Sequence, residues 1–221
     1  MATIYANSGD GMIYSPTAAW ASARDATSGT VSSTTNATEQ EAITVFAFSG
    51  RGATTYRVYR SFFYFDTSGI SNTVSSATLK LKFLTTREGD ANAIVVASTA
   101  FGGDGGTALA DADFDALDFG TPYTSEIDTS NTSTYTSITL NATALSAMQN
   151  QDVLIIALIN YAYDYLNDPP SDANTKVKVT FTDQTGTSTD PVIEYTEAAP
   201  AIPFVGMKSG KYKIVSGKIK I

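Results

Sequence analysis

Apolar and polar residues alternate along several segments of the chain, which is the pattern of a β-strand with one buried face. The clearest alternation puts Leu79, Leu81 and Phe83 on one face of a strand and Lys80 and Lys82 on the other. We expect further short strands at 3–5, 11–14, 43–48, 93–97, 134–140, 177–181 and 192–195. The pattern therefore predicts a protein built mainly of β-strands.

The segment 56–66 carries apolar residues on both faces of its predicted strand. One face holds Tyr59, Phe63 and Phe65, and the other holds Val58, Phe62 and Tyr64. Such a strand is either covered on both sides or has an outer face that contacts a partner. We expect Phe63 and Phe65 to share one core with Leu79, Leu81 and Phe83.

An apolar run from 153 to 159 shows no alternation, which indicates a central strand buried on both faces. We expect this strand to continue through alternate tyrosines into a loop at 167–174. Before it, Asn141 can cap a short helix over 142–149. Residues 15–40 are rich in Ala, Ser and Thr, and we expect a long loop or an irregular edge there.

The two central strands carry a motif. It runs Arg60-Ser61-Phe62-Phe63-Tyr64-Phe65-Asp66 and, after a polar turn, Ala77-Thr78-Leu79-Lys80-Leu81. This order resembles the signature of the DNRLRE-type β-sandwich modules, and Pro191-Val192-Ile193-Glu194-Tyr195 is similar to their closing strand. The resemblance spans residues 40–197. It implies a jelly-roll fold of the kind found in bacteriophage virion proteins and in extracellular polysaccharide-binding proteins.

Length and charge narrow the classes of function. The 221 residues suffice for one large β-sandwich with a hydrophobic core. A formal net charge of −8 argues against sequence-independent binding of nucleic acid, which needs a basic surface. No apolar run is long enough to span a membrane, and the first residues lack the regions of a secretory signal. A sandwich of this family without an export signal fits a virion protein that lysis releases.

The chain contains neither histidine nor cysteine. This composition excludes Ser-His-Asp and Cys-His catalysis, disulfide bonds and the usual zinc sites. We therefore expect no catalytic residue, and a protein that is not an enzyme.

Five aspartates cluster in one predicted loop: Asp104, Asp111, Asp113, Asp115 and Asp118. Carboxylate oxygens suit calcium, but the spacing does not match an EF-hand loop. The preferred interpretation is a solvated acidic loop with no required metal or other cofactor, and calcium is the alternative. A glycosidase pair is a weaker alternative, because nothing in the spacing separates a proton donor from a nucleophile.

Aromatic residues outside the predicted core support a second hypothesis, a carbohydrate-binding module for a cell-surface or environmental polysaccharide. The candidates for glycan contact are Trp20, Tyr123, Tyr163 and Tyr165. The simpler interpretation makes Trp20 an anchor of its loop and the tyrosines structural. Exposure of the four rings would separate these interpretations.

The composition changes after Glu197. The last 24 residues hold five of the 14 lysines and arginines and none of the 22 acidic residues, so the preceding part has a net charge of −13 (nine positive against 22 negative). Residues 198–203 form a linker stiffened by two prolines, and residues 204–221 form what we call the C-terminal arm.

The C-terminal arm contains a seven-residue repeat, Ser209 to Val215 and then Ser216 to Ile221, in which Lys alternates with Tyr or Ile. Each copy is typical of a two-faced strand. The candidate assembly residues are Tyr212, Ile214, Ile219 and Ile221 with Lys211, Lys213, Lys218 and Lys220. We expect the arm to pair with a sheet edge or groove, above all on a neighbouring subunit.

These observations predict an all-β fold: a two-sheet antiparallel β-sandwich of jelly-roll type over residues 1–197, with one short helix, a linker and a β-rich arm. The functional prediction is a non-enzymatic structural protein of a bacteriophage virion, as a capsid decoration or a fibre or tail component. Its expected partners are other virion subunits, including copies of itself, with glycans as the alternative and neither nucleic acid nor membrane.

Overall fold

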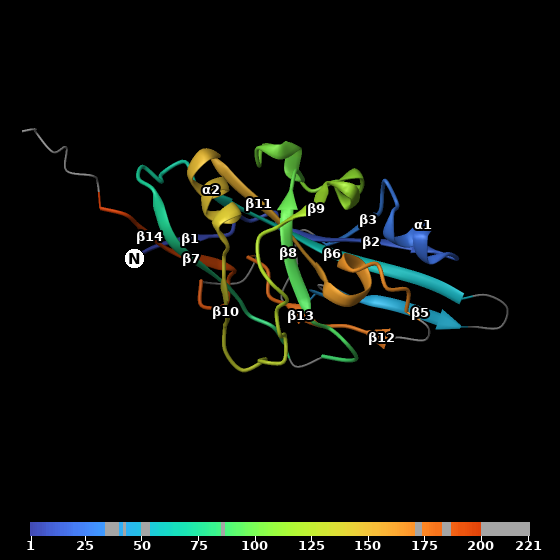
Figure 1. The fold of residues 1–221 in the computed structure, drawn as a ribbon. Helices are drawn as coiled ribbons and strands as arrows, with labels where there is room; N and C mark the ends of the chain where they lie inside the picture. The colour runs from blue at the N-terminus through green and yellow to red at the C-terminus, as the bar shows by residue number, and fades with distance from the viewer. Residues whose placement is uncertain are drawn as a thin grey trace, which may run out of the picture.

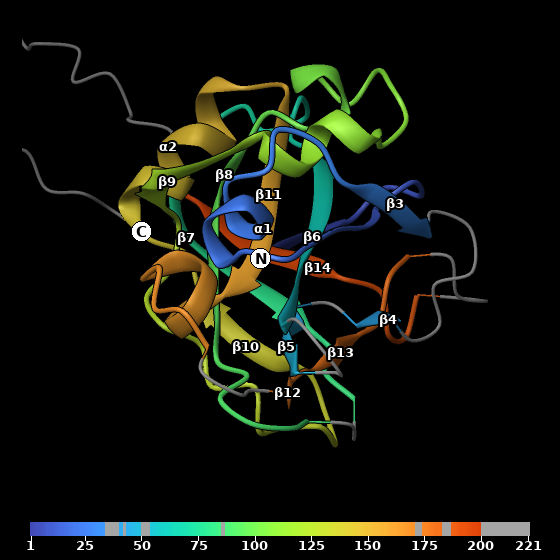
Figure 2. The ribbon, with the colours of Figure 1, turned by 90° about the vertical axis from the view of Figure 1, so that its right-hand side faces the viewer.

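The computed structural model describes residues 1–33, 40–41, 43–49, 54–84, 87–170, 174–182 and 187–199. In this part of the chain, strands form two antiparallel sheets that pack face to face, with few helices (Figures 1 and 2). The predicted all-β sandwich is confirmed. The part of the linker from 200 onward and the whole C-terminal arm lie outside the described residues.

The smaller sheet has four strands, in the order β1 (Ala2–Tyr5), β14 (Val192–Glu197), β7 (Val74–Leu81) and β10 (Thr136–Thr139). Leu79 in β7 pairs with Ile193 on one side and with Ile138 on the other. Partners in register point to the same face of a sheet. The three side chains therefore form one apolar row that faces the larger sheet.

The larger sheet follows the order β12 (Asn174–Thr175), β5 (Val45–Ser49), β6 (Thr54–Asp66), β11 (Val153–Asn160), β8 (Ala93–Ser98) and β9 (Leu117–Pro122), with β2 (Gly11–Thr17) on β6 and β3 (Thr30–Ser33) on β2. The 13-residue strand β6 pairs with β2 along one edge and with β5 and then β11 along the other. Two short strands, β4 (Gln40–Glu41) and β13 (Lys178–Val179), pair separately. In Figure 1, β5 and β12 lie at one end of the molecule and β1, β7 and β14 at the other.

The main core lies between the two sheets. Leu79, Leu81, Phe83, Phe63 and Phe65 are fully buried in one cluster there, as the alternation predicted. Each strand contributes alternate residues to this cluster because successive side chains point to opposite faces. The predicted register of the two central strands is confirmed.

A second apolar cluster covers the outer face of the larger sheet. Val58 and Phe62 of β6 are buried there beneath α1 (Trp20–Arg24), η1 (Phe101–Gly103) and η2 (Asp111–Asp115). Figure 2 shows α1 in front of the larger sheet. Of the two interpretations of the aromatic strand, cover on both sides is therefore correct. The apolar run in β11 is buried on both faces for the same reason.

The helix α2 (Ala142–Asn150) forms where the sequence predicted one. The Oδ1 atom of Asn141 accepts a hydrogen bond from the Ala144 amide at 3.1 Å, which is the expected N-cap. Met148 is buried in the main core and Leu145 packs against it. None of the helices in the described ranges has the length and apolar character needed to span a membrane.

Two local predictions differ from the structure. A long loop or an irregular edge was expected over residues 15–40, but β2 runs to Thr17 and the helix α1 follows; β3 then pairs with β2 at an edge of the larger sheet, with a register shift. The five residues of α1 are too few to show helical periodicity in the sequence. Its buried residues, Trp20 and Ala23, contact the sheet only in the folded chain. Likewise, β11 does not continue through the tyrosines: the side chain of Asn160 accepts a hydrogen bond from the Tyr163 amide and starts a π-helical turn, η3 (Tyr161–Tyr165).

Candidate functional site

The structure places the four candidate glycan residues in different environments. Trp20 is 8% exposed, and its Nε1 atom donates a hydrogen bond to Oδ1 of Asn167 at 2.9 Å. This is the anchoring role of the simpler interpretation. Tyr123 is 4% exposed and belongs to the main core. Neither ring offers a face on which a sugar could stack, which corrects their assignment as glycan contacts.

The other two candidates lie in η3. Tyr163 and Tyr165 are half-buried and pack against the outer apolar cluster. The Tyr165 ring stacks on Tyr161 with 5.8 Å between their centroids. The structure therefore brings the partly exposed ring of Tyr165 together with that of Tyr161, which was not a candidate. It does not assemble the row of four candidate rings that the carbohydrate hypothesis required.

The elements α1, η1 and η2 form an outer cover on the larger sheet, and the acidic loop attaches this cover to the sheet. Oδ1 of Asp111 accepts from the Val31 amide at 2.8 Å, and Oδ2 of Asp113 accepts from the Phe101 and Ala110 amides at 3.2 and 3.0 Å. These carboxylates satisfy backbone donors that the turns would otherwise leave open. Their clustering in sequence thus has a structural explanation.

The remaining aspartates of this loop, Asp104, Asp115 and Asp118, are exposed to solvent. Hydrogen bonds from the Thr121 hydroxyl and the Gly120 amide hold the pKa of Asp118 below its usual value. Within the described ranges, no three acidic side chains are grouped as metal ligands. A solvated loop with no required ion stays our prediction.

A fully buried ion pair, which sequence reasoning missed, links the sheet to its cover. Both Arg60 in β6 and Asp164 in η3 have side chains with no exposed surface. The Nε and Nη2 atoms of Arg60 donate to the two carboxylate oxygens of Asp164 at 2.8 Å each. Arg60 also donates to the main-chain oxygens of Phe114 and Arg24, and its guanidinium lies 4.1 Å from the centre of the Phe114 ring. The pair thereby joins β6, α1, η2 and η3.

This arrangement indicates a structural role for the pair. A buried charge is tolerated when it is paired and its hydrogen-bonding capacity is used. Arg60 stands between Val58 and Phe62 on the apolar face of its strand, a signal that could have shown its need for a buried partner. The partner lies 104 residues away in the sequence, and no pattern near Arg60 indicates that it is Asp164.

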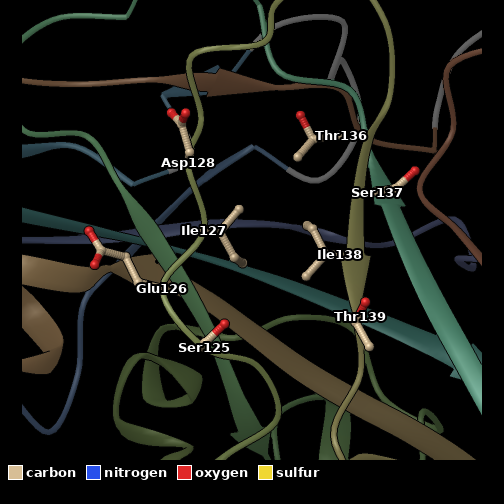
Figure 3. Close-up of a pocket in the computed structure, with 8 residues that line it drawn as sticks. All are labelled: Ser125, Glu126, Ile127, Asp128, Thr136, Ser137, Ile138 and Thr139. Atoms are coloured by element: carbon tan, nitrogen blue, oxygen red, sulfur yellow. The ribbon is translucent and has the colours of Figure 1, made fainter.

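A groove runs beside β10, the last strand of the smaller sheet. In the described part of the chain, β10 pairs with β7 on one side and with no strand on the other. The groove has a volume of about 300 Å³ and is lined by Ser125, Glu126, Ile127, Asp128, Thr136, Ser137, Ile138 and Thr139 (Figure 3). We call it the β10 groove.

The outer edge of β10 carries backbone groups that can pair with another strand. The Leu140 amide donates to the Ala77 carbonyl at 3.1 Å, which makes this a hydrogen-bonded pair of the antiparallel ladder. Because such pairs alternate, Thr136 and Ile138 face β7, and the N–H and C=O groups of Ser137 and Thr139 point the other way. An edge of this kind can accept an added strand.

The opposite wall of the β10 groove belongs to the larger sheet. Ile127 exchanges two backbone hydrogen bonds with Ala93 of β8, at 3.0 and 2.8 Å. Figure 3 shows Ile127 and Ile138 pointing toward one another across the gap. Both are 5% exposed, so they form an apolar floor at the seam between the two sheets.

Two exposed carboxylates stand on the same wall. Glu126 accepts a hydrogen bond from Nδ2 of Asn92 at 2.7 Å, and Arg87 donates to Oδ1 of that asparagine at 3.1 Å. The pKa of Asp128 is lowered, chiefly by hydrogen bonds from the amide and hydroxyl of Ser130 and further by the Arg87 charge. Asp128 is therefore ionised at neutral pH, and this wall of the groove is acidic.

Tyr135 fixes the start of β10. Its hydroxyl donates to the main-chain oxygen of Asp190 at 2.8 Å. Burial, followed by the charge of Asp190, raises the pKa of Tyr135 to about 12. The phenol therefore stays protonated at neutral pH and keeps this bond, which holds the open strand in place.

Two further hollows, of about 250 and 420 Å³, lie beside η1 and share the wall residues Ser98, Thr99 and Gln151. Asp104 and Asp152 line the larger one. We call these the η1 hollows. They are acidic like the β10 groove, and the strand residues that line the larger hollow belong to β8 and β11, which have neighbouring strands on both sides. The larger hollow therefore provides a natural control for the β10 groove.

The predicted assembly residues of the C-terminal arm lie outside the described residues: Tyr212, Ile214, Ile219, Ile221, Lys211, Lys213, Lys218 and Lys220. The prediction that this arm pairs with a sheet edge therefore remains a prediction. What the structure contributes is the strand β10, whose outer edge pairs with no strand among the described residues.

Comparison with known protein families finds no matching family model, and comparison with curated proteins finds no match. The resemblance to the DNRLRE-type modules therefore stays an expectation carried by the motif at 60–66 and 77–81.

Proposed function

We propose that this chain is a non-enzymatic structural protein of a bacteriophage virion, a capsid decoration or a fibre or tail component, that acts through subunit assembly. The observation that carries the proposal is the open edge of β10 beside a groove with an apolar floor and an acidic wall. A sheet edge that is not covered invites pairing with another chain. The virion assignment rests on the family resemblance.

Two properties favour assembly over catalysis. The chain lacks histidine and cysteine, so proton transfer and nucleophilic attack would depend on other residue types. The ion pair of Arg60 with Asp164 is fully buried and holds elements together. Contact with glycans is the less favoured function because Trp20 and Tyr123 are buried.

Deletion of residues 204–221 tests the proposal. We expect the shortened chain to keep its circular dichroism spectrum and unfolding midpoint, because the described residues supply two extensive apolar clusters. It should lose the oligomer that the full chain forms, as measured by light scattering coupled to gel filtration. The matched control replaces the arm with a Gly/Ser segment of equal length. An unchanged oligomer mass after the deletion would contradict an assembly function of the arm.

A further inference from the structure

We propose that the β10 groove is the binding site for the C-terminal arm of a second copy of this chain, which adds to the smaller sheet as a new edge strand next to β10. This inference rests on the proposed assembly function and names the surface that receives the arm. Three independent features of the groove match three features of the arm: backbone, apolar face and charge.

The backbone match follows from the hydrogen-bonding pattern between β10 and β7. Ser137 and Thr139 direct their N–H and C=O groups away from β7, which is the side that borders the groove. Strand β10 has four residues. Each copy of the arm repeat supplies a segment of that length, 211–214 or 218–221, with no proline to interrupt the hydrogen bonds. An extended peptide on such an edge gains its affinity from main-chain hydrogen bonds.

The apolar match comes from the seam between the sheets. Ile127 and Ile138 point toward each other across the groove and close its floor (Figure 3). A strand laid along β10 turns alternate side chains toward this floor. In the second arm repeat those side chains are Ile219 and Ile221. They would cover Ile127 and Ile138, which both belong to the main core.

The charge match follows from the same alternation. Glu126 and Asp128 flank Ile127 in sequence, so they lie on the solvent side of the wall and both are exposed. Lysines alternate with isoleucines in the arm, and they would face the same solvent side. The body carries a net −13 and the arm +5, so the attraction extends beyond this contact and weakens with salt.

The linker favours a second copy as the donor. The described chain leaves the sandwich at Ala198, whose amide donates to the Thr73 carbonyl at 2.7 Å, just before β7 begins. Strand β10 pairs with the far half of β7, at 78–81. Pro200 and Pro203 favour an extended linker that leads the arm away from its own sheet.

Cysteine crosslinking provides the test, because the natural chain contains no cysteine. One full-length variant carries Ser137→Cys, whose side chain lies on the solvent face of β10, and a second, tagged variant carries Lys220→Cys, which the proposed pairing puts on the same face. After mixing and mild oxidation we expect a disulfide-linked dimer of the two variants. The matched control replaces Ser137→Cys with Asp104→Cys at the η1 hollows, and it should give several-fold less dimer. Equal yields from both positions would overturn the proposal.

A single chain that carries both Ser137→Cys and Lys220→Cys separates the two possible donors. Crosslinked oligomers support an arm from a second copy. A fast-migrating monomer with an internal disulfide as the main product would show that the arm folds back on its own sheet, and would overturn the proposal.

Charge reversal gives a second readout that does not need cysteine. Glu126→Lys with Asp128→Lys should abolish the oligomer, and exchange of the four arm lysines at 211, 213, 218 and 220 for Glu should restore it in the same chain. The control variant Asp104→Lys with Asp152→Lys should assemble normally. If deletion of the arm abolishes the oligomer but reversal at the β10 groove does not, this site is wrong and the assembly function stands. If deletion has no effect, the assembly function itself fails.

Discussion

At the scale of single residues, the ion pair of Arg60 and Asp164 is the feature on which several contacts depend. Both are fully buried, and the arginine donates hydrogen bonds to three segments that are distant in sequence. Desolvation of two charges is expensive, so such a pair adds little net stability compared with well-packed apolar residues. Removal of one partner is different, because it leaves a buried charge without compensation.

We predict that Asp164→Asn lowers the free energy of unfolding by about 3–5 kcal/mol, the usual cost of breaking a buried pair. Urea denaturation followed by fluorescence measures the change. The control is Glu194→Gln, which breaks the partly exposed pair with Lys80 and should cost at most about 1 kcal/mol. Similar small losses in both variants would show that Asp164 is not essential to hold the cover on the sheet.

At the scale of elements, the long strand β6 organises the fold because it contributes to both clusters. Its inward residues pack against β7 and its outward residues pack beneath α1 and η2. The cover packs closely against the sheet at Gly29, just before β3. The Gly29 amide donates a hydrogen bond to the Asp111 carbonyl at 2.8 Å. A Cβ atom at this position would lie 2.6 Å from Cγ2 of Ile13 and 2.8 Å from the Tyr14 carbonyl oxygen.

We predict that Gly29→Ala destabilises the protein by about 1–3 kcal/mol, the typical cost of overpacking, because a backbone carbonyl cannot move aside cheaply. Thermal unfolding of the variant measures the loss. Gly69→Ala is the matched control, since no atom lies within 4 Å of its added Cβ. That substitution should be neutral or slightly stabilising. Equal behaviour of the two variants would mean that the cover is not packed tightly at Gly29.

At the scale of the whole molecule, charge is divided between an acidic body and a basic arm. Much of the acidity near the outer cover serves local geometry: Asp111 and Asp113 accept hydrogen bonds from backbone amides. Carboxylates engaged in this way are less free to coordinate a cation. The division of charge therefore favours attraction between the arm and the body more than metal binding.

We predict that calcium leaves the unfolding temperature unchanged, because no group of acidic ligands is assembled in the described ranges. Differential scanning fluorimetry with added calcium, and then with a chelator, measures this. Magnesium at the same concentration controls for ionic strength. A rise of several degrees that is specific to calcium and reversed by the chelator would contradict the prediction.

Local patterns in the sequence were sufficient to predict much of the fold. Alternation placed Leu79, Leu81 and Phe83 against Phe63 and Phe65, and Asn141 was identified as the cap of α2. These features depend on periodicity and on hydrogen bonds between near neighbours in sequence. They are therefore visible in the chain before it folds.

Tertiary structure alone decided the rest. It paired Arg60 with Asp164, buried Trp20 and Tyr123, and turned Tyr161–Tyr165 into a π-helical turn instead of a strand. It also left the edge of β10 open in the described part of the chain. Each of these outcomes depends on which distant segments meet. Contacts between distant segments and the order of strands in a sheet are properties of the packed molecule and leave no periodic signal in the local sequence.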